Sequence, residues 1–112
     1  MGNDLIDDVL LTLREAGIRC QRGYPAGRMP YLTGPVVAVN LANTATDLTT
    51  VAIHIYAPMA TGGAKCEDMA HQVVRLMDDL RGVSQVQACR FDSDLGLFSM
   101  TILSTFQFYL TQ

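Results

Sequence analysis

The chain has 112 residues, of which 49% are hydrophobic and only 17% are charged. This length fits one domain with one hydrophobic core. Eight basic residues against eleven acidic ones give a net charge of −3, which argues against nucleic-acid binding through a general positive surface. Because about a quarter of residues are usually charged, the low charge indicates either surface hidden between copies of the chain or simply an apolar-rich small domain.

The cysteines and the N-terminus indicate a cytosolic protein. Cys20, Cys66 and Cys89 are odd in number and far apart, so we expect reduced thiols packed as small hydrophobic groups. The first residues are acidic where a secretion signal would be basic, and position 6 is Ile where a myristoylation pattern requires Ser or Thr. Residues 95–112 are uncharged, but Ser, Thr and Gln alternate there with apolar residues, which favours a strand over a membrane helix.

Residues 3–16 predict an amphipathic helix. Its apolar residues recur at spacings of three and four and are Leu5, Ile6, Val9, Leu10 and Leu13. Gly17 followed by Ile18 is a typical helix end. A short strand is expected within 18–24, and residues 23–35 hold three Gly and three Pro, which predicts a long connection or a projecting loop.

The next elements are two strands and a second helix. Strands are expected from Val36 and from Thr49, joined by a turn. In the second strand, one face is expected to carry Val51, Ile53, Ile55 and Ala57, and the other Thr50, Ala52, His54 and Tyr56. A helix follows over about 65–81, and Gly82 is expected to end it.

The chain closes with a strand over 83–91, a turn at 92–96 and a long uncharged strand over 97–110. The fold class is therefore α+β: one domain over 1–112, with a single antiparallel or mixed sheet and two helices on one face, in the order α-β-β-β-α-β-β. A 14-residue strand would span on the order of 46 Å, which exceeds the core of so small a domain. Either the closing strand bends or is internal to the sheet, or a partner covers its end or edge.

No residue pattern predicts chemistry. The stretch TGGAK lacks the spacing of a phosphate-binding loop. Glu67 and His71 are expected to be an ordinary surface pair rather than metal ligands with Cys66, and His54 a half-buried sheet residue. Asp92 and Asp94 fit a hairpin turn better than a cation site. We therefore expect no catalytic, cofactor-binding or metal-binding residues and no cofactor, although a Cys–His nucleophile pair stays open.

The order of elements resembles a known family. The stretch MAHQVVRLMDDLRGVSQVQACRFDSDLGLFSMTILSTFQFYL, a helix ending in Arg-Gly, a strand, an Asp-containing turn and a long Ser/Thr-rich strand, is similar to tail-terminator and tail-completion (head–tail joining) proteins of long-tailed bacteriophages and prophages. The resemblance implies a non-enzymatic α+β subunit that forms a homo-oligomeric ring, commonly a hexamer. It also implies tail-tube and head-connector partners, and a place in the virion tail after assembly in the bacterial cytoplasm, with no membrane and no sequence-specific nucleic acid.

Two sets of residues are the expected contacts with neighbouring subunits or the tail tube. The loop set is Arg22, Tyr24, Arg28, Met29 and Tyr31, and the closing strand adds Gln107 and Tyr109. A small dimeric ligand-binding or regulatory module is the alternative function, and it would need an apolar pocket using His54 or the arginines at 19–28. An enzyme with a reactive thiol is a third hypothesis.

Overall fold

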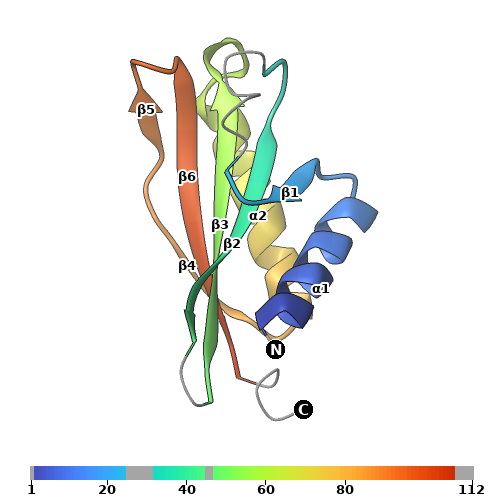
Figure 1. Ribbon diagram of the computed structural model, residues 1–112. Helices are drawn as coiled ribbons and strands as arrows, with labels where there is room; N and C mark the ends of the chain where they lie inside the picture. Colours follow the sequence, from blue (N-terminus) through green and yellow to red (C-terminus); the bar gives the residue numbers. More distant parts are fainter. Residues whose placement is uncertain (1, 25–31, 45–46, 108–112) are drawn as a thin grey trace.

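The computed structural model describes residues 2–24, 32–44 and 47–107, with side chains from Leu5 onward. The elements in chain order are α1 (Gly2–Glu15), β1 (Cys20–Arg22), β2 (Val36–Thr44), β3 (Thr49–Pro58), a short 3-10 helix η2 (Met59–Thr61), α2 (Gly63–Asp79), β4 (Val83–Val86), β5 (Arg90–Asp92) and β6 (Leu97–Phe106) (Figure 1). The α+β prediction is confirmed, as is the approximate order of its elements.

The strands form one mixed sheet in the order β1-β2-β3-β6-β4, and β5 pairs with β6 beyond the end of β4. Only β1 and β2 are parallel; the other pairs are antiparallel. The single strand predicted over 83–91 was wrong, because the chain forms two short strands with a break between them. At this break, the amide of Gln87 still donates to the carbonyl of Thr101 over 2.9 Å.

The long closing strand is internal to the sheet. β6 pairs with β3 along all ten of its residues, from Leu97 opposite Pro58 to Phe106 opposite Thr49. Its other side pairs with β4 and β5. The open edges of the sheet are therefore β1 on one side and β4 with β5 on the other.

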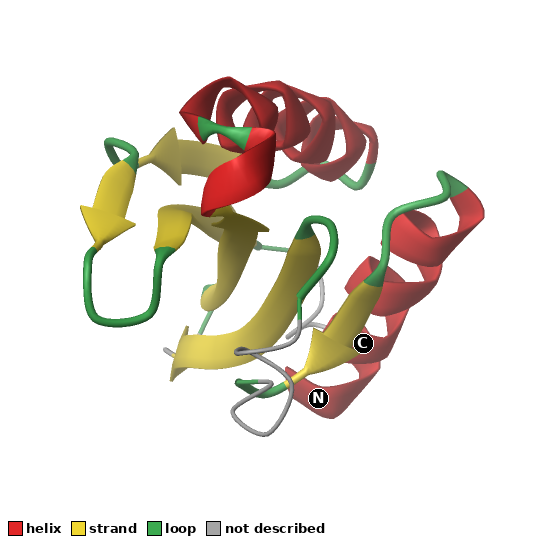
Figure 2. Ribbon diagram, turned by 90° about the horizontal axis from the view of Figure 1, so that it is seen from above, coloured by secondary structure: helices red, strands yellow, loops and turns green. Residues whose placement is uncertain are grey.

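Both helices cover one face of a strongly curved sheet (Figure 2). Alternation along β3 and β6 sends every second side chain towards the helices. The buried cluster joins the apolar stripe of α1 to Cys66, Ala70, Val73 and Met77 of α2 and to strand residues that include Val37, Val39, Ile53, Ile55, Met100, Ile102 and Phe106. The predicted division of β3 into two faces is confirmed.

The two helices end by different means. At the end of α1, Gly17 has φ 82° and the amide of Ile18 donates to the carbonyl of Leu13 over 3.0 Å, as the sequence predicts. α2 ends at Asp79, and the left-handed residue after it is Arg81, with φ 66°. Gly82 as the helix-ending glycine was therefore a wrong prediction. Glycine is needed at this position for another reason, since a Cβ atom there would lie 2.5 Å from the ring of Phe106.

The hairpin of β2 and β3 runs past the ends of both helices (Figure 1). The first half of β2 is buried, whereas its last four residues, 41–44, are exposed. A register shift between Leu41 and Asn43 marks the point where β2 leaves the body. The end of β2 is therefore exposed, whereas Thr49 and Val51 of β3 beside it are buried and paired with β6.

Candidate interaction surface

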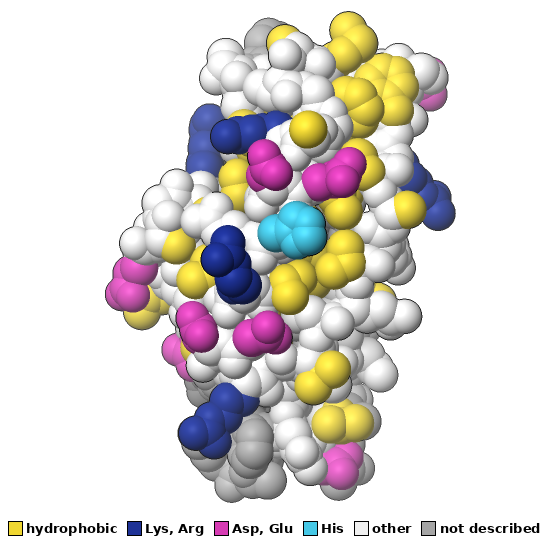
Figure 3. Space-filling view, turned by 180° about the vertical axis from the view of Figure 1, so that it is seen from behind, with side chains coloured by type: hydrophobic (Ala, Val, Ile, Leu, Met, Phe, Trp, Pro, Cys, Tyr) yellow, Lys and Arg dark blue, Asp and Glu magenta, His cyan; other side chains and the backbone are white. Residues whose placement is uncertain are grey.

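The three central strands, β2, β3 and β6, contain no Asp, Glu, Lys or Arg. One face of these strands packs on the helices, and no helix covers the opposite face (Figure 2). We call this opposite face the open face. Its half-buried side chains are Asn40, Thr50, His54, Tyr56, Ser99, Thr101, Leu103 and Thr105, and its buried ones include Val36, Ala38 and Ala52. Acidic and basic side chains are scattered over the face of the molecule seen in Figure 3.

Hydrogen bonds between strands satisfy polar side chains on the open face. The hydroxyls of Thr50 and Thr105 lie 2.9 Å apart, and Nδ1 of His54 lies 3.0 Å from the hydroxyl of Thr101. Burial lowers the pKa of His54 below 6.5, so its ring is neutral at pH 7. The prediction of a half-buried sheet histidine is confirmed, and the open face stays uncharged.

An aromatic row crosses the open face towards β1. The rings of Tyr24 and Tyr56 meet edge to face with centroids 5.5 Å apart, and the ring of His54 stacks on Tyr56 at 6.3 Å. Burial, and to a lesser degree the neighbouring Tyr24, raises the pKa of Tyr56. Tyr24 is 49% exposed, so the row presents aromatic surface to solvent.

The predicted contact residues divide into those that the structure describes and those that it does not. Arg22 and Tyr24 are exposed, with Arg22 at the end of β1 and Tyr24 beside the open face. Gln107 is exposed directly after β6. Arg28, Met29 and Tyr31 of the Gly/Pro-rich loop, and Tyr109, lie outside the described residues.

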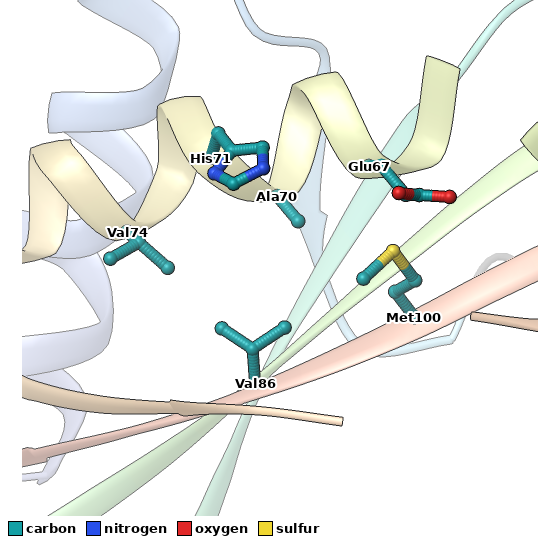
Figure 4. A pocket seen from close by; sticks show the side chains of 6 residues that line it. All are labelled: Glu67, Ala70, His71, Val74, Val86 and Met100. Atoms are coloured by element: carbon teal, nitrogen blue, oxygen red, sulfur yellow. The ribbon is translucent and has the colours of Figure 1, made fainter. Parts of the chain in front are cut away.

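A cavity of about 220 Å³ lies between α2 and the sheet edge (Figure 4). It is lined by Glu67, Ala70, His71, Val74, Val86 and Met100. The sequence did not indicate this site. Glu67 and His71 are exposed one turn apart, as expected of a surface pair, but Val86 and Met100 join them only through strand pairing. Neither His54 nor an arginine lines the cavity.

The cysteines of the structure are all free thiols. Sγ of Cys66 donates to the carbonyl of Phe98 over 3.5 Å, and Sγ of Cys20 donates to the carbonyl of Leu10 over 3.6 Å. Burial, with a smaller effect of the neighbouring Cys89, raises the pKa of Cys66 to about 12. A thiol with this pKa is a poor nucleophile at neutral pH.

The acidic residues after β5 form a hairpin turn. Oδ1 of Asp92 accepts hydrogen bonds from the amides of Asp94 and Leu95, at 2.9 and 3.2 Å, and Gly96 has φ 64°. The hairpin-turn prediction is therefore confirmed. Within residues 2–24, 32–44 and 47–107, no group of three His, Cys, Asp or Glu side chains is placed to hold a metal ion.

Comparison with known proteins leaves the geometry as the basis for function. No protein-family model and no curated protein matches the sequence. Of the two α-helices in the described ranges, neither combines the length and the apolar character needed to span a membrane.

Proposed function

We propose that this chain is a non-enzymatic structural subunit of a homo-oligomeric ring, of the tail-terminator or head–tail joining type found in long-tailed phages and prophages. In this role the ring, of which a hexamer is one form, caps the tail tube and contacts tail-tube and head-connector proteins in the virion. The observation that carries the proposal is the open face: three central strands without one formal charge, left without helical cover.

Such a face suits burial against another protein. Cores of protein interfaces are depleted in charged residues, and burying a charge is costly unless it is paired. On the open face, the hydroxyls of Thr50, Thr101 and Thr105 already have partners within the sheet. Covering these three hydroxyls therefore leaves each of them with its partner in the sheet.

The exposed end of β2 supports the same role. β2 is exposed from Leu41 to Thr44, where the hairpin passes the ends of the helices. This exposed segment gains stability when a neighbouring subunit or tube protein packs against it.

The absence of enzyme chemistry is part of the proposal. The buried Cys66, with a pKa of about 12, does not favour a thiol enzyme. The cavity at α2 is the observation that favours the alternative, a small ligand-binding module. Its polar lining consists of Glu67 and His71 alone, and the same lining is explained by a protein contact below.

Light scattering after gel filtration, with negative-stain microscopy of the peak, tests the proposal. We expect a ring from the wild-type chain, alone or with tail-tube protein. Leu103→Lys places a charge on the open face and is expected to weaken assembly at least about tenfold. Gln72→Lys, on the exposed side of α2, is the matched control and is expected to assemble normally. A monomer at every concentration, with no ring in the presence of tail components, would overturn the proposal.

A further inference from the structure

The two edges of the sheet are aligned by one row of paired residues. The row runs across the sheet through Arg22, Val39, Ile53, Ile102 and Val86. Arg22 ends β1 at one edge, and Val86 ends β4 at the other. Because Val39 and Ile53 belong to the buried cluster, the row lies on the helix side of the sheet.

Both edge strands direct backbone groups away from the sheet. The amide of Gln87 donates to β6, so alternation turns the amides and carbonyls of Ser84 and Val86 outward. On β1, the carbonyl of Arg19 and the amide of Gly23 bond to β2, which turns those of Cys20 and Arg22 outward. In the described sheet no strand lies beyond β1 or β4.

The two edges also run in opposite directions. β1 is parallel to β2, and three antiparallel pairings then lead from β2 to β4. β1 of one copy can therefore pair with β4 of another as an antiparallel ladder, with both sheets facing the same way. Such a head-to-tail contact uses two different surfaces of one chain, and it closes a ring when the rotation between copies allows.

The cavity beside Val86 combines apolar walls with one carboxylate, which suits the stem and the charged end of an arginine side chain. Ala70, Val74, Val86 and Met100 provide apolar walls, and the Glu67 carboxylate is its single acidic group. The labelled side chains of α2 lie across the cavity from Val86 and Met100 (Figure 4). A guanidinium group pairs well with a carboxylate while its aliphatic stem lies on apolar surface. No Lys or Arg lines the cavity, and His71, one turn along α2 from Glu67, is its only basic side chain.

We infer that Arg22 of one copy enters the cavity of the next copy and pairs with Glu67, while β1 of the first copy extends the sheet at β4 of the second. This inference rests on the proposed ring and names the contact that builds it. Arg22 is exposed and lies on the helix side of β1, which is the side of the cavity. Charge complementarity therefore favours a second copy as the occupant.

Charge reversal tests the contact. Arg22→Glu and Glu67→Arg each place like charges at every interface, and each is expected to weaken ring assembly about tenfold or more in sedimentation velocity. An equimolar mixture of the two variants restores opposite charges at every interface of an alternating ring, so we expect assembly to recover. The matched controls are Arg19→Glu, which alternates to the open face, and Asp68→Lys, the next residue of α2. Both are expected to assemble like the wild type.

The outcomes separate this contact from the proposed function. Recovery in the mixture, with normal controls, supports the contact. Rings that form equally well from Arg22→Glu or Glu67→Arg overturn the contact and leave the ring proposal intact. Loss in both variants without recovery in the mixture also overturns it. A wild-type chain that is monomeric with and without tail components overturns the ring and the contact together. Circular dichroism of each variant verifies that the fold is kept.

Discussion

A Cβ atom on Gly82 would lie 2.5 Å from Cε2 of Phe106. The glycine follows α2 and the ring is at the far end of β6, so the two meet only in the folded chain. Gly82 does not have a positive φ, and its need for glycine is therefore one of space. Phe106 is 1% exposed, so its ring has little room to move away.

Gly82→Ala is expected to lower the free energy of unfolding by about 1–3 kcal/mol, because the added methyl group overpacks the ring. Urea unfolding followed by circular dichroism measures the change. Gly34→Ala is the control, since no atom lies within 4 Å of its added Cβ. Equal urea midpoints for the two variants would contradict a clash between the added methyl group and the Phe106 ring.

Arg81→Gly is expected to raise stability by about 0.5–1 kcal/mol, because a left-handed backbone at φ 66° is unfavourable for any residue with a Cβ. Arg75→Gly, in the middle of α2, is the comparison and should lose about 1 kcal/mol. Thermal unfolding of both variants provides the measurement. A lower melting temperature for Arg81→Gly would show that its side chain stabilises the fold by more than the backbone strain costs.

Thr49→Val is expected to stabilise the fold by about 1 kcal/mol. The Thr49 hydroxyl is buried and makes no hydrogen bond, and removing an unsatisfied buried polar group recovers its desolvation cost. The adjacent Thr50→Val removes a hydroxyl that is bonded to Thr105 and should be neutral or destabilising. Chemical denaturation of the pair tests the difference, and the reverse ranking would contradict it.

Acidification is expected to destabilise the fold through His54. Burial lowers the pKa of His54 in the folded state below the unfolded value of 6.5. As the pH falls below about 6.5, His54 therefore takes up a proton more readily in the unfolded chain than in the folded one, and the free energy of unfolding decreases. Above about pH 6.5 the stabilisation from the neutral His54 is fully present. His54→Gln should flatten the melting temperature between about pH 7.5 and 5.5. The exposed His71→Gln should keep the wild-type slope, and loss of the slope in this control would exclude His54 as its source.

Cys66 is expected to resist iodoacetamide in the folded state at neutral pH, because burial raises its pKa to about 12 and leaves little thiolate. In concentrated urea all three cysteines should react. Peptide mass spectrometry after timed alkylation identifies the modified thiols. Rapid labelling of native Cys66 would revive the thiol-enzyme hypothesis.

The local sequence patterns predicted most helices and strands well, but they predicted poorly the features that depend on strand pairing and on the backbone at the end of α2. The helix stripe of α1, its Gly17 end and the two faces of β3 follow from periodicity within a few residues. The prediction of one strand over 83–91 was wrong because the break at 87–89 depends on the pairing with β6. No local pattern shows this pairing. The end of α2 was assigned to Gly82 on residue type alone, whereas the backbone turns at Arg81.

The candidate surfaces divide in the same way. The sequence by itself determined that β2, β3 and β6 carry no charge, since composition is independent of the fold. Only the tertiary structure decided that these strands are adjacent, that one of their faces is open, and that β6 is internal. It also brought Glu67 of α2 to Val86 of β4 and aligned Arg22 with Val86 across the sheet. Strand pairing joins residues that are distant in the chain, and its register depends on the packing of the whole core rather than on any segment.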